Sequence, residues 1–381
     1  MFHVMVQLAY IGPGLYLLLR LRRLVRPGKG RIIFYVLFAL LFAAWPLTEA
    51  LAHRTTGKSW AGLLTIGYLT MPYLLNLFLF TLFSDLALGL LRLLRRIPSM
   101  TPAGPWRRYL LVQLLALPLA MMAFGVWNYH TLRVNEYRVD LPRQESSLSK
   151  LRAVLVSDFH LGELTTKKFI AEFPEKINQL KPDLVLIPGD IMENDRGLDD
   201  APFVSMFRKL TPRLGVWASP GNHEHHGREV NGDFFSRAGI QMLENELATV
   251  AGSVTLAGAG FGGHRIKRPP LAPLVARAPA NLPLIVLSHR PPDDKEIIGL
   301  RPALYVSGHT HAGQLFPVNL INDQLYDTSW GLRNVGQSRV VVTSGVQGWG
   351  PPVRTWGNSE IVLIEIVFQN PSPQRGSGHT N

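Results

Sequence analysis

The sequence predicts a helical membrane domain followed by a layered α/β domain, and the distribution of charge is the first observation behind this prediction. The 381 residues are 47% apolar and only 17% charged, with a net charge of +12, whereas a globular domain has about 25% charged residues. Residues 1–130 carry 13 Lys and Arg but 2 Asp and Glu, and residues 131–381 carry 26 and 25. The positive charge therefore belongs to the apolar first half. The second half is nearly neutral, so no nucleic acid is expected as a partner.

The second observation is a set of long apolar segments in residues 1–127, where we expect a membrane domain with four transmembrane helices. About 20 apolar residues are needed to cross a bilayer, and segments 32–51, 63–83 and 109–127 meet this requirement. Segment 4–19 is shorter and contains Gly12-Pro13-Gly14. An uncleaved signal sequence is the alternative for it, but the basic residues of a signal sequence precede its apolar stretch. Here they follow it, so we interpret 4–19 as a span.

The basic residues of the predicted loops orient these helices. Loops 20–31 and 92–108 hold six and five Lys and Arg, and loop 52–60 holds two. Because basic loops stay in the cytoplasm, the sequence predicts a multi-pass protein of the cell membrane whose second half lies outside the cytoplasm. Asp85 is expected to reach the headgroup region beside Arg92, since ionisable side chains near helix ends do so.

The third observation is the alternation of short apolar segments and helix-like segments in the second half. Residues 128–150 are expected to form an extended linker and residues 370–381 a disordered tail, which leaves 151–369 for the α/β domain. Near-continuous runs of Val, Leu and Ile are typical of strands covered on both faces. The alternation, followed by consecutive strands, predicts a layered domain with at least one large sheet. The predicted strands are 153–157, 184–188, 215–219, 254–259, 284–288, 303–307, 340–343 and 361–368, and the predicted helices are 166–180, 199–210 and 229–238.

Polar side chains follow five of these strands at the point where each strand ends. Open α/β sheets bind ligands at the carboxyl ends of their strands, so these side chains should converge. A spacing of two residues, as in Asp158–His160 and His309–His311, would place both side chains on one face of extended backbone. The five motifs are Asp158-Phe159-His160, Gly189-Asp190, Gly221-Asn222-His223-Glu224, His289 and His309-Thr310-His311.

The converging set offers more ligands than one metal ion uses. It contains two carboxylates, one amide oxygen and four imidazoles, with His223 in addition, and one ion takes about four to six ligands. The chain has no Cys, so oxygen and nitrogen must hold any metal. Two ions that share a carboxylate would use the whole set, and such a pair is the arrangement that hydrolyses phosphoesters. A single His in this set is commonly a core or surface residue, but all five strand ends together indicate a dinuclear site.

The order of these motifs resembles the calcineurin-like metallophosphoesterases over residues 151–367. The stretches 157–162, 308–314 and 344–354 are similar to the YkuE-like phosphodiesterases, and the apolar spans before the domain resemble the transmembrane proteins with a metallophosphoesterase domain. The resemblance implies a metallophosphoesterase-type α/β fold with a central β-sandwich flanked by helices. The chain departs from the family pattern at His225-His226, where aromatic residues are often seen, and at Ala312, where Gly is frequent.

The resemblance also implies a role for each site residue. His223 would face the phosphate and either stabilise its charge or protonate the leaving oxygen. Glu193 stands where the family has an Asp that orients this imidazole, and a surface carboxylate in the acidic loop 193–200 is the alternative for it. One metal ion would be held by Asp158, His160 and His311 and the other by Asn222, His289 and His309, with Asp190 as the bridge.

We therefore expect a membrane-anchored phosphodiesterase or phosphatase that uses two divalent ions, Mn, Fe, Zn or Mg, for in-line attack of metal-bound hydroxide on phosphorus. Its partners would be the bilayer and a phosphoester substrate, which a lipid could carry. A pyrophosphatase that acts on a UDP-2,3-diacylglucosamine-type lipid is the alternative, and it would face the cytoplasm. A catalytically silent membrane sensor or anchor is a third hypothesis, but no ligand position is missing. Residues 264–268 could bind anionic headgroups or form a solvated basic loop.

Overall fold

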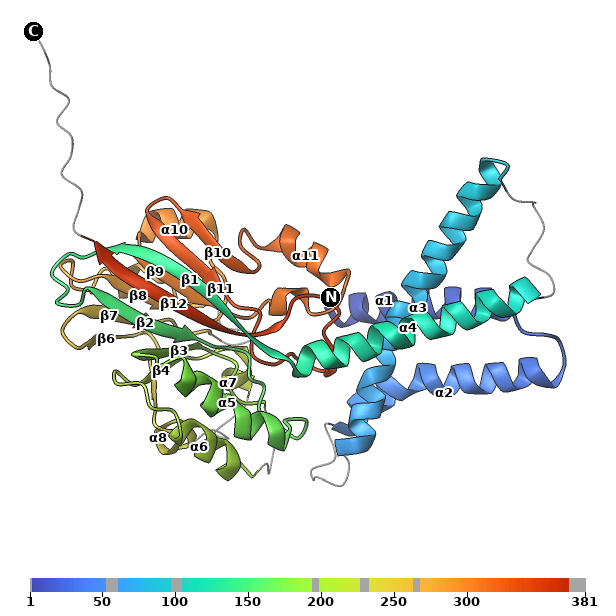
Figure 1. Cartoon of the computed structure of the whole chain (residues 1–381), viewed down its shortest axis with the longest axis horizontal. Coiled ribbons are helices and arrows are strands. Elements are labelled where there is room, and N and C mark those ends of the chain that lie inside the picture. The colour runs from blue at the N-terminus through green and yellow to red at the C-terminus, as the bar shows by residue number, and fades with distance from the viewer. Residues whose placement is uncertain are drawn as a thin grey trace, which may run out of the picture. The chain divides into compact units, whose positions relative to one another are not determined.

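The computed structural model describes residues 2–52, 61–96, 105–193, 199–226, 233–262 and 268–369. The chain forms two compact units. The first consists of Met1–Tyr129 with Gly350–Thr355, and the second of His130–Trp349 with Trp356–Asn381. Figure 1 shows that the first unit is helical and that the second is built on β-sheets.

Long apolar helices make up most of the first unit. Among the described residues, three helices are long and apolar enough to cross a membrane, through Lys29–Leu51, Gly62–Leu93 and Arg108–His130. These stretches contain the predicted spans 32–51, 63–83 and 109–127. The predicted span 4–19 is helical, and its crossing of the membrane stays a prediction. The helices are α1 (Phe2–Leu21), α2 (Lys29–Ala52), α3 (Ala61–Leu93) and α4 (Pro105–His130).

A polar contact joins α1 to α3. Nε of Arg20 lies 2.6 Å from Oδ2 of Asp85, and the Tyr16 hydroxyl donates to the same oxygen at 2.8 Å. Asp85, expected to reach the headgroups beside Arg92, is therefore held between two helices. Only 24% of the Asp85 side chain is exposed, so water alone cannot satisfy its carboxylate. The ion pair with Arg20 and the hydrogen bond from Tyr16 do so instead.

Two six-stranded sheets form the centre of the second unit. The strand orders are β1-β12-β2-β3-β4-β5 and β10-β11-β9-β8-β7-β6. The strands are β1 (Leu132–Pro142), β2 (Lys150–Leu155), β3 (Leu184–Pro188), β4 (Val216–Ser219), β5 (Ile240–Met242), β6 (Glu246–Val250), β7 (Val254–Gly258), β8 (Leu284–Leu287), β9 (Leu304–Ser307), β10 (Gly331–Val335), β11 (Ser338–Val342) and β12 (Ser359–Gln369). The helices are α5 (Lys167–Gln179), α6 (Ala201–Arg208), α7 (Asn222–His226), α8 (Phe234–Ala238), α9 (Ala272–Val275), α10 (Asp294–Leu300) and α11 (Val318–Leu325), with a 3₁₀ turn η1 (His311–Gly313).

The buried clusters show that the second unit has four layers: helices, two sheets and helices. Side chains of both sheets, such as Leu155 and Leu287, pack against each other in one fully buried cluster. A second cluster joins the first sheet to α5, α6 and α8, and a third joins the second sheet to α9 and α10. Figure 1 shows α5, α6 and α8 on one outer face of the sheets and α10 on the opposite face. The predicted β-sandwich flanked by helices is confirmed.

The segment 128–150 differs from the expected linker. It is extended, but residues 132–142 form β1, which pairs in parallel with β12 along its whole length, from Leu132–Ser359 to Pro142–Gln369. Its exposed charged residues, including Glu136 and Arg138, interrupt the apolar pattern, so a search for apolar runs misses the strand. The short edge strands β5, β6 and β10 and the helices α9, α10 and α11 are also absent from the sequence prediction, because their apolar runs are short.

Candidate active site

The expected site residues gather where central strands of both sheets end. Asp158, Asp190 and Asn222 follow β2, β3 and β4 in the first sheet, and His289 and His309 follow β8 and β9 in the second. Strands β2, β3 and β4 are parallel to one another, as are β8 and β9. Because the carboxyl ends of parallel strands meet at one edge, the five segments bring their polar residues together.

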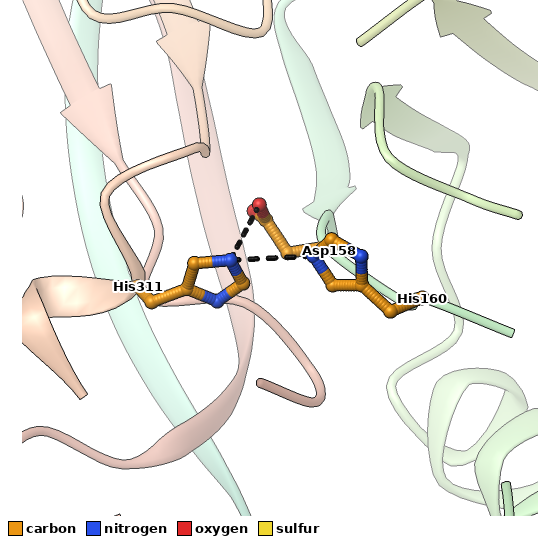
Figure 2. A group of neighbouring side chains, drawn as sticks. All are labelled: Asp158, His160 and His311. Atoms are coloured by element: carbon orange, nitrogen blue, oxygen red, sulfur yellow. Dashed lines mark hydrogen bonds and ion pairs between the residues drawn. The ribbon is translucent and has the colours of Figure 1, made fainter. Parts of the chain in front are cut away.

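Asp158, His160 and His311 form the first group of candidate metal ligands, shown in Figure 2. Nε2 of His311 lies 3.3 Å from Nε2 of His160 and 3.5 Å from Oδ1 of Asp158. Asp158 is fully buried, and burial raises the pKa of its carboxyl. Its oxygens accept a hydrogen bond from the backbone N–H of His309 at 3.1 Å. A carboxylate oxygen and two imidazole nitrogens that face one another are a typical divalent-metal ligand set.

The backbone that carries these ligands is left-handed, which corrects the expectation of extended backbone at Asp158–His160 and His309–His311. The φ angles are 56° at Asp158, 44° at His160, 52° at Asp190, 74° at His309 and 50° at His311. This region costs a non-glycine residue of order 1–3 kcal/mol. Hydrogen bonds between the loops hold it, such as that from the N–H of His160 to the carbonyl of Asp190 at 3.1 Å. Backbone strain at several neighbouring residues of one cluster is typical of functional sites.

Asp190, His289 and His309 form the second group. Nε2 of His289 lies 3.0 Å from Oδ2 of Asp190 and 3.1 Å from Nδ1 of His309. Nδ1 of His289 lies 2.9 Å from the carbonyl oxygen of Pro188. Because that oxygen can only accept, Nδ1 carries the proton and Nε2 faces the group. Burial and the neighbouring His289 lower the pKa of His309 to about 3, so its ring is neutral, which is the metal-binding form.

Asp190 lies between the two groups. Its Oδ2 is 3.8 Å from Nε2 of His160, and its Oδ1 accepts the backbone N–H of His223 at 3.0 Å. Burial would raise the pKa of Asp190, but His289, His160 and His223 hold it well below its usual range. The carboxylate is therefore ionised and faces ligands of both groups.

Asn222 contributes an amide oxygen that the described protein atoms leave unsatisfied. Oδ1 of Asn222 is buried and has no hydrogen-bond partner among the described residues. Leaving a buried acceptor unpaired costs about 1–3 kcal/mol. A metal ion bound at this oxygen would account for its position.

Glu193 touches both a candidate ligand and the candidate catalytic imidazole. Its Oε2 lies 2.8 Å from Nδ1 of His160, and its Oε1 lies 3.2 Å from Nδ1 of His223. Burial would raise the pKa of Glu193, but the hydrogen bonds to the two imidazoles lower it to about 2. Burial would lower the pKa of His223, whereas Glu193 and the charge of Asp190 raise it to about 9. The two side chains therefore form an ion pair at neutral pH.

Glu224 has a structural role in the loops that carry Asp190, Asn222 and His223. Its carboxylate accepts backbone N–H groups of Asp190, Ile191, Met192 and Gly221 at 2.6–3.2 Å. These bonds fix the loop after β3 to the loop after β4. They hold Asp190 in its left-handed conformation beside Asn222 and His223.

Comparisons with known proteins agree with this geometry. A sequence model of the calcineurin-like phosphoesterase family matches residues 151–313. A transmembrane protein with metallophosphoesterase domain from Danio rerio is 30% identical over 361 residues, which cover 88% of this chain and 80% of that protein. The chain is a calcineurin-like metallophosphoesterase. An uncharacterized metallophosphoesterase from Helicobacter pylori is 32% identical over 232 residues, 58% of this chain and 61% of that protein. Phosphodiesterase YaeI of Escherichia coli is 29% identical over 238 residues, 58% of this chain and 84% of that protein.

The metallophosphoesterase family implies divalent metal ions, and the residues present fit them. The donors are carboxylate oxygens, imidazole nitrogens and the unsatisfied amide oxygen of Asn222, a set that suits Mn, Fe, Zn or Mg. Hydrogen bonds to Glu193 and to the Pro188 carbonyl orient the rings of His160 and His289. Ligating imidazoles usually have such partners. This metallophosphoesterase is thus a metal-dependent phosphoester hydrolase.

Some functional contacts of this metallophosphoesterase are not visible in its sequence. The bond between Glu193 and His160 links residues 33 positions apart, and no spacing rule signals it. Gln347 donates from Nε2 to the carbonyl of Phe159 at 2.7 Å and so supports the Asp158–His160 loop. Its place in the stretch 344–354, which resembles the family, is the signal that could have found it. The side chains of His225 and His226 and residues 264–267 lie outside the described residues, and Arg268 is paired with Glu296.

Proposed function

We propose that this metallophosphoesterase hydrolyses phosphodiesters or phosphomonoesters with two divalent ions and that Asp190 bridges the ions. The observation that carries the proposal is the position of Oδ2 of Asp190, 3.0 Å from Nε2 of His289 and 3.8 Å from Nε2 of His160. One carboxylate thereby serves both ligand groups. The first ion would be held by Asp158, His160 and His311, and the second by Asn222, His289 and His309.

The chemistry of hydrolysis would be divided between the ions and His223. When bound, a pair of ions activates water for in-line attack on phosphorus and binds phosphoryl oxygens. His223 is protonated at neutral pH, because its pKa is raised to about 9. It would donate this proton to the leaving oxygen or stabilise the negative charge on the phosphoryl group. Glu193 would hold Nδ1 of the ring and leave Nε2 toward the substrate.

The enzyme would be anchored in the cell membrane with its catalytic unit outside the cytoplasm. In the part of the chain that the structure describes, three helices are long and apolar enough to span a bilayer. The fish relative that covers most of the chain is itself named a transmembrane protein. Loops 20–31 and 92–108 carry eleven Lys and Arg against two in loop 52–60, and this bias supports the orientation.

Metal analysis of the full chain tests the dinuclear site. Purified wild-type protein should approach two ions per chain, and Asp190→Asn should abolish hydrolysis of bis(p-nitrophenyl) phosphate and p-nitrophenyl phosphate while the protein stays folded. Asp140→Asn, at an exposed position of β1, is the matched control and should behave as wild type. Turnover of wild-type size in Asp190→Asn, or a single ion per wild-type chain, would refute the bridge.

A further inference from the structure

Helix α11 (Val318–Leu325) exposes its four apolar residues together with Asp323 and Gln324, and it turns Asn319 and Asn322 inward. Val318, Leu320, Ile321 and Leu325 are 38–69% exposed, whereas Asn319 is 2% exposed. Asn322 also faces inward, and its Nδ2 donates to the carbonyl of Thr310 at 2.7 Å. A surface helix of a soluble protein has the opposite arrangement. The outer face of α11 is therefore suited to an apolar environment.

Three exposed aromatic residues extend this face around the start of α11. Phe316, Trp349 and Trp356 are 43–53% exposed. Gln314 is hydrogen-bonded to the backbone of both tryptophans. Its side-chain Nε2 donates to the backbone carbonyl of Trp349 at 3.2 Å, and its backbone carbonyl accepts the backbone N–H of Trp356 at 3.1 Å. We call these seven residues the apolar rim: Phe316, Val318, Leu320, Ile321, Leu325, Trp349 and Trp356. Tryptophan is enriched where a protein meets the headgroup region of a bilayer.

Chain connectivity ties the rim to the end of a candidate membrane span. Trp349 and Trp356 flank Gly350–Thr355, which belongs to the compact unit of the apolar helices. Within that unit, the N–H of Arg354 donates to the carbonyl of Gly125 at 2.9 Å, and Nδ2 of Asn128 donates to the carbonyl of Arg354 at 3.1 Å. Gly125 and Asn128 lie in the last turns of the span Arg108–His130. Trp349 thus directly precedes, and Trp356 directly follows, a segment that is hydrogen-bonded to the last turns of this span.

Helix α11, which carries part of the apolar rim, also contacts the loop that contains His309 and His311. The Thr310 hydroxyl donates to the carbonyl of Ser329 at 2.6 Å, and the Thr310 carbonyl accepts from Asn322 of α11. The Tyr326 ring, directly after α11, packs edge-on at 6.2 Å from the His309 ring. A surface that holds α11 would therefore also hold the loop that carries His309 and His311.

We propose that the apolar rim binds the membrane interface and presents the active site to a phosphoester in the headgroup of a membrane lipid. This inference rests on the proposed function and specifies its substrate class. An interfacial helix inserts its apolar face at the boundary of headgroups and acyl chains. The exposed leucine and isoleucine of α11 supply that face, and the tryptophans mark the headgroup level. A lipid phosphoester would reach the metal ligands without leaving the bilayer.

Site-specific fluorescence on the full chain tests the membrane contact. The chain has no Cys, so Leu320→Cys gives a single labelling site for an environment-sensitive dye. Ile298→Cys on α10 is the matched control, because Ile298 is 56% and Leu320 54% exposed. In phosphatidylcholine proteoliposomes that contain doxyl-labelled lipid, the dye at 320 should shift to the blue and be quenched, and the dye at 298 should not. Equal quenching at both positions would overturn the proposal. A blue shift that grows with protein concentration without lipid quenching would show a second copy on this face and overturn it too.

A matched pair of substrates tests the lipid specificity. Hexadecyl p-nitrophenyl phosphate in vesicles and soluble methyl p-nitrophenyl phosphate have the same reacting group. The double variant Leu320→Gln, Ile321→Gln should lower kcat/KM for the hexadecyl ester about tenfold, because interfacial binding scales with apolar area. Its activity on the methyl ester should match that of Ile298→Gln and wild type. Equal losses on both esters would refute the rim's role, and absence of hydrolysis of both esters in every protein, wild type included, would refute the proposed function itself.

Discussion

Replacing Glu193 by Gln should move the alkaline limit of activity to lower pH. The substitution keeps the length of the side chain and one acceptor oxygen but removes the negative charge between His160 and His223. The raised pKa of His223, about 9, compares with about 6.5 for an unperturbed His, and the difference corresponds to about 3 kcal/mol in favour of the protonated ring. Glu193 lies 3.2 Å from Nδ1 of His223, and Asp190 lies 4.0 Å from Nε2. The nearer carboxylate should supply most of the effect.

The direction of the shift in the alkaline limb depends on whether the protonated or the neutral ring of His223 is the active form. In the proposed mechanism the protonated ring donates to the leaving oxygen, so kcat should fall as pH rises through the pKa of His223. Loss of an adjacent opposite charge lowers such a pKa by about 1–3 units, and burial, which also lowers it, persists in the variant. The alkaline limb of the kcat–pH profile should therefore shift downward by about 1–3 units in Glu193→Gln.

The assay is the kcat–pH profile of metal-loaded full-chain protein on bis(p-nitrophenyl) phosphate. Bound metal ions lower the pKa of His223, and with it the pH of the alkaline limb, in wild type and variant alike. The measured quantity is therefore the difference in pH between the two alkaline limbs. Glu193→Asp keeps the charge and should keep the limb close to that of wild type. A lower kcat with an unmoved alkaline limb in Glu193→Gln would refute the reasoning, because Glu193 would then not control the protonation of His223.

Three other outcomes are expected. His223→Asn should lower kcat by about 10²–10⁴-fold with nearly unchanged metal content, and loss of activity only through loss of metal would instead make His223 a ligand. Gly308→Ala should reduce the amount of bound metal, because a Cβ at Gly308 would collide with Oδ2 of Asp158. Gly299→Ala is the control, since no atom lies within 4 Å of its added Cβ. Equal metal content in the two variants would contradict this prediction. Alkaline phosphatase fused after Trp127 should be active and a cytoplasmic reporter silent, and the opposite pattern would favour the cytoplasm-facing lipid pyrophosphatase.

The elements predicted well from the sequence are those with long apolar runs. Strand Leu184–Pro188 is found with the predicted bounds, because all five residues are buried in the middle of a sheet and leave no polar position to confuse the pattern. Three spans are recovered because each is a long, nearly uninterrupted apolar run. Strand β1 and helix α11 are missed for different reasons: β1 alternates charged and half-buried residues, and the apolar runs of α11 are short.

The candidate site could be predicted as a set of residues but not as a geometry. Strand ends deliver the ligands, and their spacing is visible in the sequence. The left-handed backbone at Asp158 and His160 is not, because neither residue type signals positive φ by itself. Ala312 is a partial exception. Gly is frequent at this position in the family, and the φ of 51° at Ala312 explains that preference.

The pairing of β1 with β12 has a consequence for how the protein is made. β1 (Leu132–Pro142) is the first strand to follow the membrane helices, and its neighbour in the sheet, β12 (Ser359–Gln369), is the last strand of the described chain. At a synthesis rate of about 5–20 residues per second, β12 is completed roughly 10–45 s after β1. Throughout this interval β1, which follows the candidate spans, lacks its partner strand, and the first sheet is incomplete. Folding of the catalytic unit is thus completed only after nearly the whole chain has been synthesised. A recombinant catalytic fragment that starts at Leu151 would lack β1 and leave the apolar edge of β12 open to aggregation.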